Sequence, residues 1–156
     1  MPSPAERLTS LWTRLRPLPG GRWMFSRLFG FMVPYSGTIR SNIEILEPGH
    51  CRSRLRDRRG VRQHLGSVHA VALVNLGEMT SGLAMTMALP PGVRGIVTDL
   101  RAQYLKKARG TLHGESRVTV PAIGAEPIDH EVETVIHDEA GDVVCRVHTI
   151  WRLART

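Results

Sequence analysis

Two stretches near the N-terminus space their apolar residues three or four positions apart, which is the spacing of one helix face. The first begins at Ser3 or Pro4 and is ended by the Pro- and Gly-rich residues 17–21, and the second ends before Pro34. The two expected stripes are Leu8, Leu11, Trp12 and Leu15, and then Trp23, Met24, Leu28, Phe29 and Met32. We expect these stripes to pack on the body of the protein. Attachment to a membrane surface through the arginine-rich polar faces is the alternative.

From Thr38 the period of the pattern changes to two, which predicts strands. The residues expected on one face of the first strand are Ile39, Ser41, Ile43 and Ile45. Pro48-Gly49 predicts a turn. The residues expected on the inner face of the second strand are Cys51, Ser53 and Leu55.

A long apolar run, Ala70 to Leu89, follows these strands and is rich in Gly and Ala. Pro90-Pro91-Gly92 ends it, so the run predicts a helix that is buried nearly all round. Glu78 stands in the middle of this run, and a carboxylate at mid-bilayer is costly. We therefore expect a helix inside the protein and no stable membrane insertion.

Four more alternating segments complete the chain. They are 93–104, 111–120, 129–137 and 143–153, and the last two form a hairpin across 138–142. One helix flanked by six strands predicts an α+β fold in which a single antiparallel sheet wraps around the central helix. The expected organisation is an N-terminal helical segment, residues 1–35, packed on a domain that spans residues 36–156.

Charge is distributed unevenly along the chain of 156 residues, whose formal net charge is +7. Residues 1–62 contain twelve arginines and four acids, whereas residues 126–156 contain three arginines and seven acids. A basic protein suggests nucleic acid as a partner. With two Tyr and three Phe the chain has no platform for base stacking, so no nucleic-acid partner is expected.

Cys51 and Cys145 have no metal-ligand spacing, so no metal and no cofactor is expected. Two cysteines without a disulfide framework favour a reducing cytoplasm. Arginines interrupt the first apolar stretch, which excludes a secretory signal. Residues 1–30 also have the arginine-rich, acid-poor composition of a mitochondrial transit peptide, which is the alternative localisation.

The loop from Gln63 to His69 leads into the long helix and carries the candidate chemistry. Backbone N–H groups at a helix start are free and favour negative charge, so they can hold a developing oxyanion. Glu78 lies nine residues after His69 and is the only ionisable group in the helix. A desolvated carboxyl of this kind is a candidate general base or nucleophile. A structural ion pair with Arg94 or Arg101 is the alternative for Glu78, and a purely structural hydrogen bond is the alternative for His69.

These residues resemble the hotdog-fold thioesterases of the phenylacetyl-CoA-thioesterase type, and more closely an uncharacterised bacterial branch of that superfamily. The shared motif here is Gly66, His69-Ala70 and Glu78. The segments 33–37, 46–49 and 104–110 also look like that branch, and the resemblance covers about residues 20–153. Two positions depart from the pattern: Gln63 replaces the family's Asn, and Glu78 replaces the Asp common in the phenylacetyl-CoA type.

The resemblance implies a hydrolase for acyl-CoA or acyl-carrier-protein thioesters. In it the Ala70 N–H polarises the thioester carbonyl, and Glu78 activates water or attacks the carbonyl. Gln63 orients water or substrate, His69 shapes the loop and hydrogen-bonds near the thioester, and Gly66 is among the substrate-binding residues. The same resemblance places the site between subunits of a homodimer or homotetramer, so that Glu78 of one subunit faces Ala70 of another. The side chains expected near the acyl group are Thr80, Ser81 and Thr98. A non-catalytic acyl-thioester-binding protein is the alternative, because of Gln63.

Lys106, Lys107 and Arg109 cluster in the turn after the third strand. Lysine and arginine bind phosphate, and in related proteins this turn lies at the nucleotide end of the ligand. We therefore expect these residues to contact coenzyme A phosphates, with a solvated turn as the alternative.

Overall fold

The computed structural model describes residues 3–156. Its N-terminal helices are α1 (Pro4–Leu15), α2 (Gly21–Met32) and the short α3 (Pro34–Gly37). The strands are β1 (Asn42–Glu47), β2 (His50–Leu55), β3 (Val93–Tyr104), β4 (Leu112–Arg117), β5 (Ile128–His137) and β6 (Val143–Arg155). The long helix α4 (Ala70–Ala88) lies between β2 and β3 in the chain, after the 3-10 turn η1 (Arg59–Val61).

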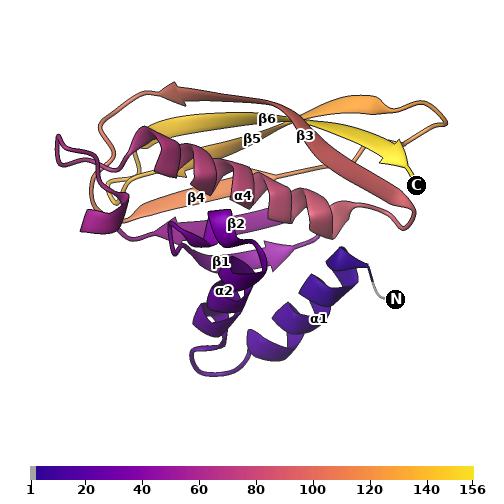
Figure 1. Cartoon of the computed structure of the whole chain (residues 1–156), viewed down its shortest axis with the longest axis horizontal. Coiled ribbons are helices and arrows are strands. Elements are labelled where there is room, and N and C mark those ends of the chain that lie inside the picture. Colours follow the sequence, from indigo (N-terminus) through magenta and orange to yellow (C-terminus); the bar gives the residue numbers. More distant parts are fainter. Residues whose placement is uncertain (1–2) are drawn as a thin grey trace.

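The six strands form one antiparallel sheet in the order β1-β2-β4-β5-β6-β3. In Figure 1, α4 runs across the face of this sheet, and α1 and α2 lie beside β1. The sheet edges are therefore β1, which α2 covers, and β3. This is the predicted α+β hotdog architecture.

The main core lies between α4 and the concave face of the sheet. Leu76 and Leu83 of α4 meet Cys51, Leu112 and Val147 from three strands. Gly77 allows the closest approach, because a Cβ atom built there would lie 2.4 Å from the side chain of Val147 on β6. The small residues of α4 thus let the helix seat directly on the sheet.

Replacing Gly77 with Ala should therefore destabilise the fold by about 1–3 kcal/mol, the usual cost of overpacking a core. Gly82 provides the matched control within α4, since a Cβ there would meet Trp151 at an ordinary 3.5 Å. Urea unfolding of the two Ala variants measures the difference. Equal stability of the Gly77→Ala variant and the parent would show that α4 does not pack this tightly.

Helices α1 and α2 contribute Trp12, Phe25 and Phe29 to the main core, but the buried face of α2 differs from the expected one. Trp12 of α1 contacts Phe25 of α2 edge-to-face, with 5.0 Å between ring centroids. On α2 the buried residues are Gly21, Phe25, Ser26 and Phe29. Of the predicted stripe only Phe29 is buried, and the exposed members are Trp23, Met24, Leu28 and Met32.

The first strand begins later than predicted. Residues 34–37 form α3, and Arg40 has a left-handed φ of 49°, so pairing starts at Asn42. A register shift between Ile43 and Ile45 then breaks the alternation, and Leu46 rather than Ile45 points into the core. On β2 the predicted alternation holds, with Cys51, Ser53 and Leu55 buried. On β3 a register shift between Val97 and Asp99 breaks the predicted alternation, and β4 is shorter than the predicted 111–120.

The predicted buried helix is α4, and no helix among residues 3–156 is long and apolar enough to cross a membrane. Cys51 and Cys145 are both buried and free. The division at residue 35 stays a prediction, since α3 spans it.

Candidate functional site

The loop before α4 is shaped by its own hydrogen bonds. Gly66 has a left-handed φ of 78°, and its N–H donates to the Gln63 carbonyl. The Gln63 N–H donates to the Ser67 carbonyl, and the Val68 N–H donates to Ala108 at 2.8 Å. The loop is therefore a closed turn that is tied to the segment after β3. In this chain Gly66 provides the left-handed backbone that closes the turn.

His69 caps the start of α4. Its Nδ1 atom accepts a hydrogen bond from the Val71 N–H at 3.0 Å, so a neutral ring carries its proton on Nε2. The Ala70 residue is exposed, and its N–H has no acceptor among residues 3–156. The helix start therefore offers a free donor at Ala70, at the positive end of the helix dipole.

Glu78 is half-buried and lies on the less buried stripe of α4, in line with Val74 and Gly82. Burial raises the pKa of its carboxyl above the ordinary value. The carboxylate has no hydrogen bond or ion pair within residues 3–156. Arg101, one of the two partners considered above, instead pairs with Asp99 and Glu131. Glu78 is thus not held in an ion pair within the described residues, and a desolvated carboxyl of this kind is a candidate general base.

Ala70 and Glu78 are eight residues apart on one helix, which separates them by about 12 Å along its axis. A thioester carbonyl that accepts from the Ala70 N–H is then beyond hydrogen-bond reach of Glu78 in the same chain. One copy of the chain holds the two groups but does not bring them to one reacting atom.

The side chain of Gln63 forms its hydrogen bonds within its own loop. Its side-chain Nε2 donates to Ser67 Oγ at 2.7 Å, and its Oε1 accepts from the Leu65 N–H at 3.2 Å. One N–H of Nε2 and one lone pair of Oε1 remain free to bond to other partners. The side chain thus stabilises the loop that presents Ala70.

The three candidates for acyl contacts lie in different environments. Thr80 and Ser81 are fully buried, and Thr80 contacts Ser53 Oγ at 2.5 Å. Ser81 Oγ donates to the Glu78 carbonyl at 3.0 Å. Thr98 is exposed on the edge strand β3. Within residues 3–156 none of the three hydroxyls hydrogen-bonds to the Glu78 carboxylate.

The cationic turn after β3 is divided by its contacts. Lys106 Nζ pairs with Asp138 at 2.6 Å and with Asp142 at 2.7 Å, and these contacts hold the β5–β6 turn. Lys107 and Arg109 are exposed and have no ion pair within residues 3–156. The carbonyl of Ala108 between them anchors the Val68 N–H. Lys107 and Arg109 therefore flank the loop that leads to Ala70.

Two residues that the sequence analysis missed organise this region. Tyr104, at the end of β3, donates from its hydroxyl to the Ala70 carbonyl at 3.2 Å. Asp57 accepts from Arg62 at 2.6 Å and from the Gly110 N–H at 3.0 Å, and these hydrogen bonds lower the pKa of its carboxyl. Both are long-range contacts, and the one signal in the sequence is that Asp57 is the only acid in the arginine-rich residues 52–62. Residues 3–156 contain no cluster of His, Cys, Asp or Glu that could hold a metal ion.

The comparisons with known proteins agree with this fold. The family model described as "Domain of unknown function (DUF4442)" matches residues 21–153. A structural-genomics protein has 24% identity and a TM-score of 0.83, with 96% of this chain and 99% of that chain covered. A Pseudomonas aeruginosa protein of unknown function, called a probable thioesterase, has 24% identity and a TM-score of 0.71, with 89% and 97% covered.

A hypothetical thioesterase from Streptococcus pneumoniae, solved with coenzyme A, has 17% identity and a TM-score of 0.66, and the match covers 81% of this chain and 98% of that one. No curated protein matches the sequence. The family match spans most of the chain, and the structural matches share its helix-and-sheet arrangement. The chain therefore belongs to the DUF4442 family and has the hotdog fold of bacterial thioesterases.

Proposed function

We propose that the protein hydrolyses acyl thioesters of coenzyme A or of an acyl carrier protein, in the cytoplasm, with Glu78 as general base or nucleophile. The observation that carries this proposal is the Glu78 carboxyl, which has no hydrogen-bond or ion-pair partner among residues 3–156, is the only ionisable group of α4 and has a raised pKa. A carboxyl of this kind costs stability as a structural feature. A raised pKa makes this carboxyl a better acceptor of a proton from water.

The active site is formed by two copies of the chain. The outer edge of β3 is unpaired in residues 3–156, and Ile96, Leu100 and Tyr104 on this strand are exposed. An unpaired strand edge with apolar side chains is suited to pairing with another strand. A two-fold pairing along β3 runs the two α4 helices in opposite directions. The Ala70 N–H of one copy then polarises the thioester carbonyl. The Glu78 carboxylate of the other copy attacks that carbonyl or activates a water molecule that attacks it.

A panel of acyl-CoA thioesters of increasing chain length, assayed by thiol release, tests the proposal. Turnover of at least one thioester is the expected result. Binding of these thioesters without turnover favours the alternative of a non-catalytic acyl-thioester-binding protein. This alternative is supported by the Gln63 side chain, because both ends of its amide already form hydrogen bonds within the loop.

Lys107 and Arg109 contact the coenzyme A phosphates in this proposal. Replacing both with Ala should raise the KM for acyl-CoA about tenfold and leave kcat unchanged, because uniform binding is lost. An acyl-N-acetylcysteamine thioester has no phosphates, so its KM should not change. An equal KM for acyl-CoA in the parent and the double variant would assign these residues to a solvated turn.

A further inference from the structure

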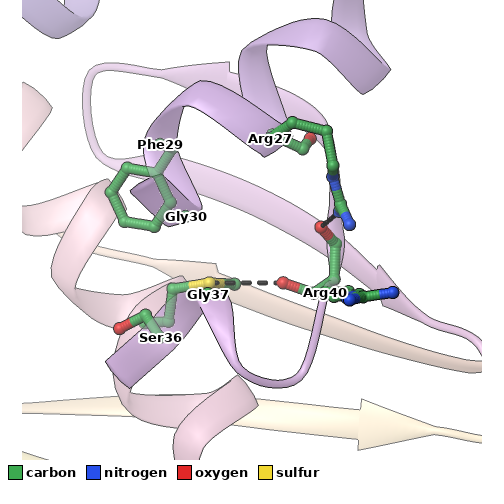
Figure 2. A pocket seen from close by; sticks show the side chains of 9 residues that line it. Arg27, Phe29, Gly30, Ser36, Gly37 and Arg40 are labelled. Atoms are coloured by element: carbon green, nitrogen blue, oxygen red, sulfur yellow. Dashed lines mark hydrogen bonds between the residues drawn. The ribbon is translucent and has the colours of Figure 1, made fainter. Parts of the chain in front are cut away.

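A small pocket lies between α2, α3, the residues just before β1 and Met79 of α4 (Figure 2). Its volume is about 190 Å³. Pockets for whole drug-sized ligands are larger, about 300–1,000 Å³, so this pocket suits a small group. The polar side chains that line it are Ser26, Arg27, Ser36, Arg40 and Ser41.

Arg27 and Arg40 line this pocket, Arg58 lies near Arg27, and none of the lining residues is acidic. Burial, and then the nearby charges of Arg40 and Arg58, lower the pKa of Arg27. None of the three forms an ion pair within residues 3–156. Figure 2 shows Arg27 and Arg40 extending toward the same side of the pocket. Cations held together in this way favour an anion from outside the chain.

Two details of these arginines point to a ligand. The Arg27 Nε atom is buried and has no hydrogen-bond partner, while Arg27 Nη2 donates to the Ser41 carbonyl. Arg40 has a φ of 49°, a left-handed conformation that favours Gly or Asn. A free buried donor and a cation on strained backbone thus lie at the same pocket.

Next to the pocket, α2 presents an apolar stripe that nothing covers. Met24, Leu28 and Phe31 lie at i, i+4 and i+7, and all are exposed, with Phe31 85% exposed. The exposed apolar residues continue with Met32 at the end of α2 and with Val33 and Tyr35 after it. Gly30 connects this stripe to the pocket, because it lines the pocket from the same helix. We call the stripe and the pocket together the α2–α3 face.

The charge around the α2–α3 face selects its partner. Residues 3–41 contain six arginines and one acid, Glu6, which is engaged in capping α1 at Ser3. A two-fold contact between two copies through this face would bring arginines against arginines. Anionic lipid headgroups complement the arginines, and the hydrocarbon beneath them accepts the apolar stripe.

We propose that the α2–α3 face docks on an anionic lipid bilayer, where the arginine pocket binds a lipid phosphate and the stripe enters the headgroup region. Exposed Trp23 and Tyr35 suit this depth, since both residue types concentrate at the membrane interface. The contact is peripheral, because no described helix is able to span a bilayer. The proposal is independent of the thioesterase proposal.

Tryptophan fluorescence with lipid vesicles tests this proposal. Trp12 and Trp151 are already buried, at 4% and 8% exposure, whereas Trp23 is 61% exposed. Vesicles of equal parts phosphatidylglycerol and phosphatidylcholine should shift the emission to the blue, and the Trp23→Phe variant should lose that shift. Pure phosphatidylcholine vesicles should give no shift. An equal shift with both vesicle types overturns the role of the arginines.

Co-sedimentation with the same vesicles separates the pocket from general charge. Arg40→Asn keeps a residue that tolerates a left-handed φ, and it should weaken vesicle binding about fivefold, the usual effect of one basic residue at an anionic membrane. Arg94→Gln removes an equal charge from β3, at the opposite sheet edge, and should leave binding unchanged. Phe31→Ser should weaken binding at least as much as Arg40→Asn. Equal vesicle binding by the Arg40→Asn and Arg94→Gln variants overturns the claim that the arginine pocket binds a lipid phosphate.

Two other occupants give distinct results, and each overturns the proposal. If a second copy covers this face, the parent protein does not bind vesicles. Sedimentation then gives a lower molecular mass for the Phe31→Ser variant than for the parent. If free phosphate is the ligand, inorganic phosphate binds with a dependence on Arg40 while vesicles do not. Hydrolysis of a soluble short-chain acyl-CoA should be unaffected by Phe31→Ser, so failure here leaves the thioesterase proposal intact.

Discussion

The Glu78→Gln variant should lose at least a hundredfold to a thousandfold in kcat while it keeps the fold. The amide preserves the shape of the side chain but cannot accept a proton from water or attack a carbonyl. General-base catalysis contributes about 10²–10⁴ in rate, and loss of a nucleophile costs more. Glu78→Asp, which keeps a carboxylate, should retain part of the activity. Glu126→Gln removes an exposed carboxylate from a loop and provides the control.

The thermal stability of Glu78→Gln distinguishes a catalytic carboxyl from a structural one. Burial raises the pKa of Glu78 in the folded state, so the folded state holds the proton to a higher pH than the unfolded state. The contribution of Glu78 to the free energy of unfolding therefore falls as pH rises through the folded pKa. Above that pH, Glu78→Gln should be at least as stable as the parent. A clear loss of Tm, or full activity, contradicts the assignment.

Ala70→Pro should lower kcat about 10²–10³-fold, the cost of removing one oxyanion donor. Proline deletes the N–H, yet it is favoured at the first position of a helix. His69 already has φ −65° and ψ 139°, which is the backbone that a residue before proline prefers. Circular dichroism should therefore report an unchanged fold.

Ala70→Ser provides the matched control, because it alters the side chain and keeps the N–H. It should retain activity close to that of the parent. If Ala70→Pro is as active as Ala70→Ser, the start of α4 does not supply the oxyanion donor.

The sequence predicts the central helix and most strands because these have strong, unambiguous periods. α4 begins at Ala70 and ends before Pro90, as expected, and β3 has the predicted bounds 93–104. Helix α2 is harder, because apolar residues lie nearly all round it and the stripe has no unique phase. Packing of Phe25 against Trp12 decides its buried face, and that contact depends on tertiary structure.

The first strand shows a second limit of sequence reasoning. One extra residue at the bulge after Ile43 moves every later side chain to the other face, so Leu46 replaces Ile45 in the core. Nothing in the local pattern marks that insertion. The residue pattern and the family resemblance did single out Glu78, because an acid in an apolar helix is visible in sequence. The sequence does not reveal the hydrogen bond of Gln63 to Ser67 or the ion pair of Lys106 with Asp138, because both form only in the folded chain.

The central claim is that one active site uses Ala70 of one copy and Glu78 of another, and mixing two inactive variants tests it most directly. Glu78→Gln and Ala70→Pro are unfolded together in equal amounts, refolded and assayed for thiol release. Random assortment makes half of the dimers mixed, and each mixed dimer has one site with both groups intact. The account predicts recovery of about a quarter of the parent activity. No recovery, with mixed dimers shown to form, would place both groups of a working site in one chain and contradict the account.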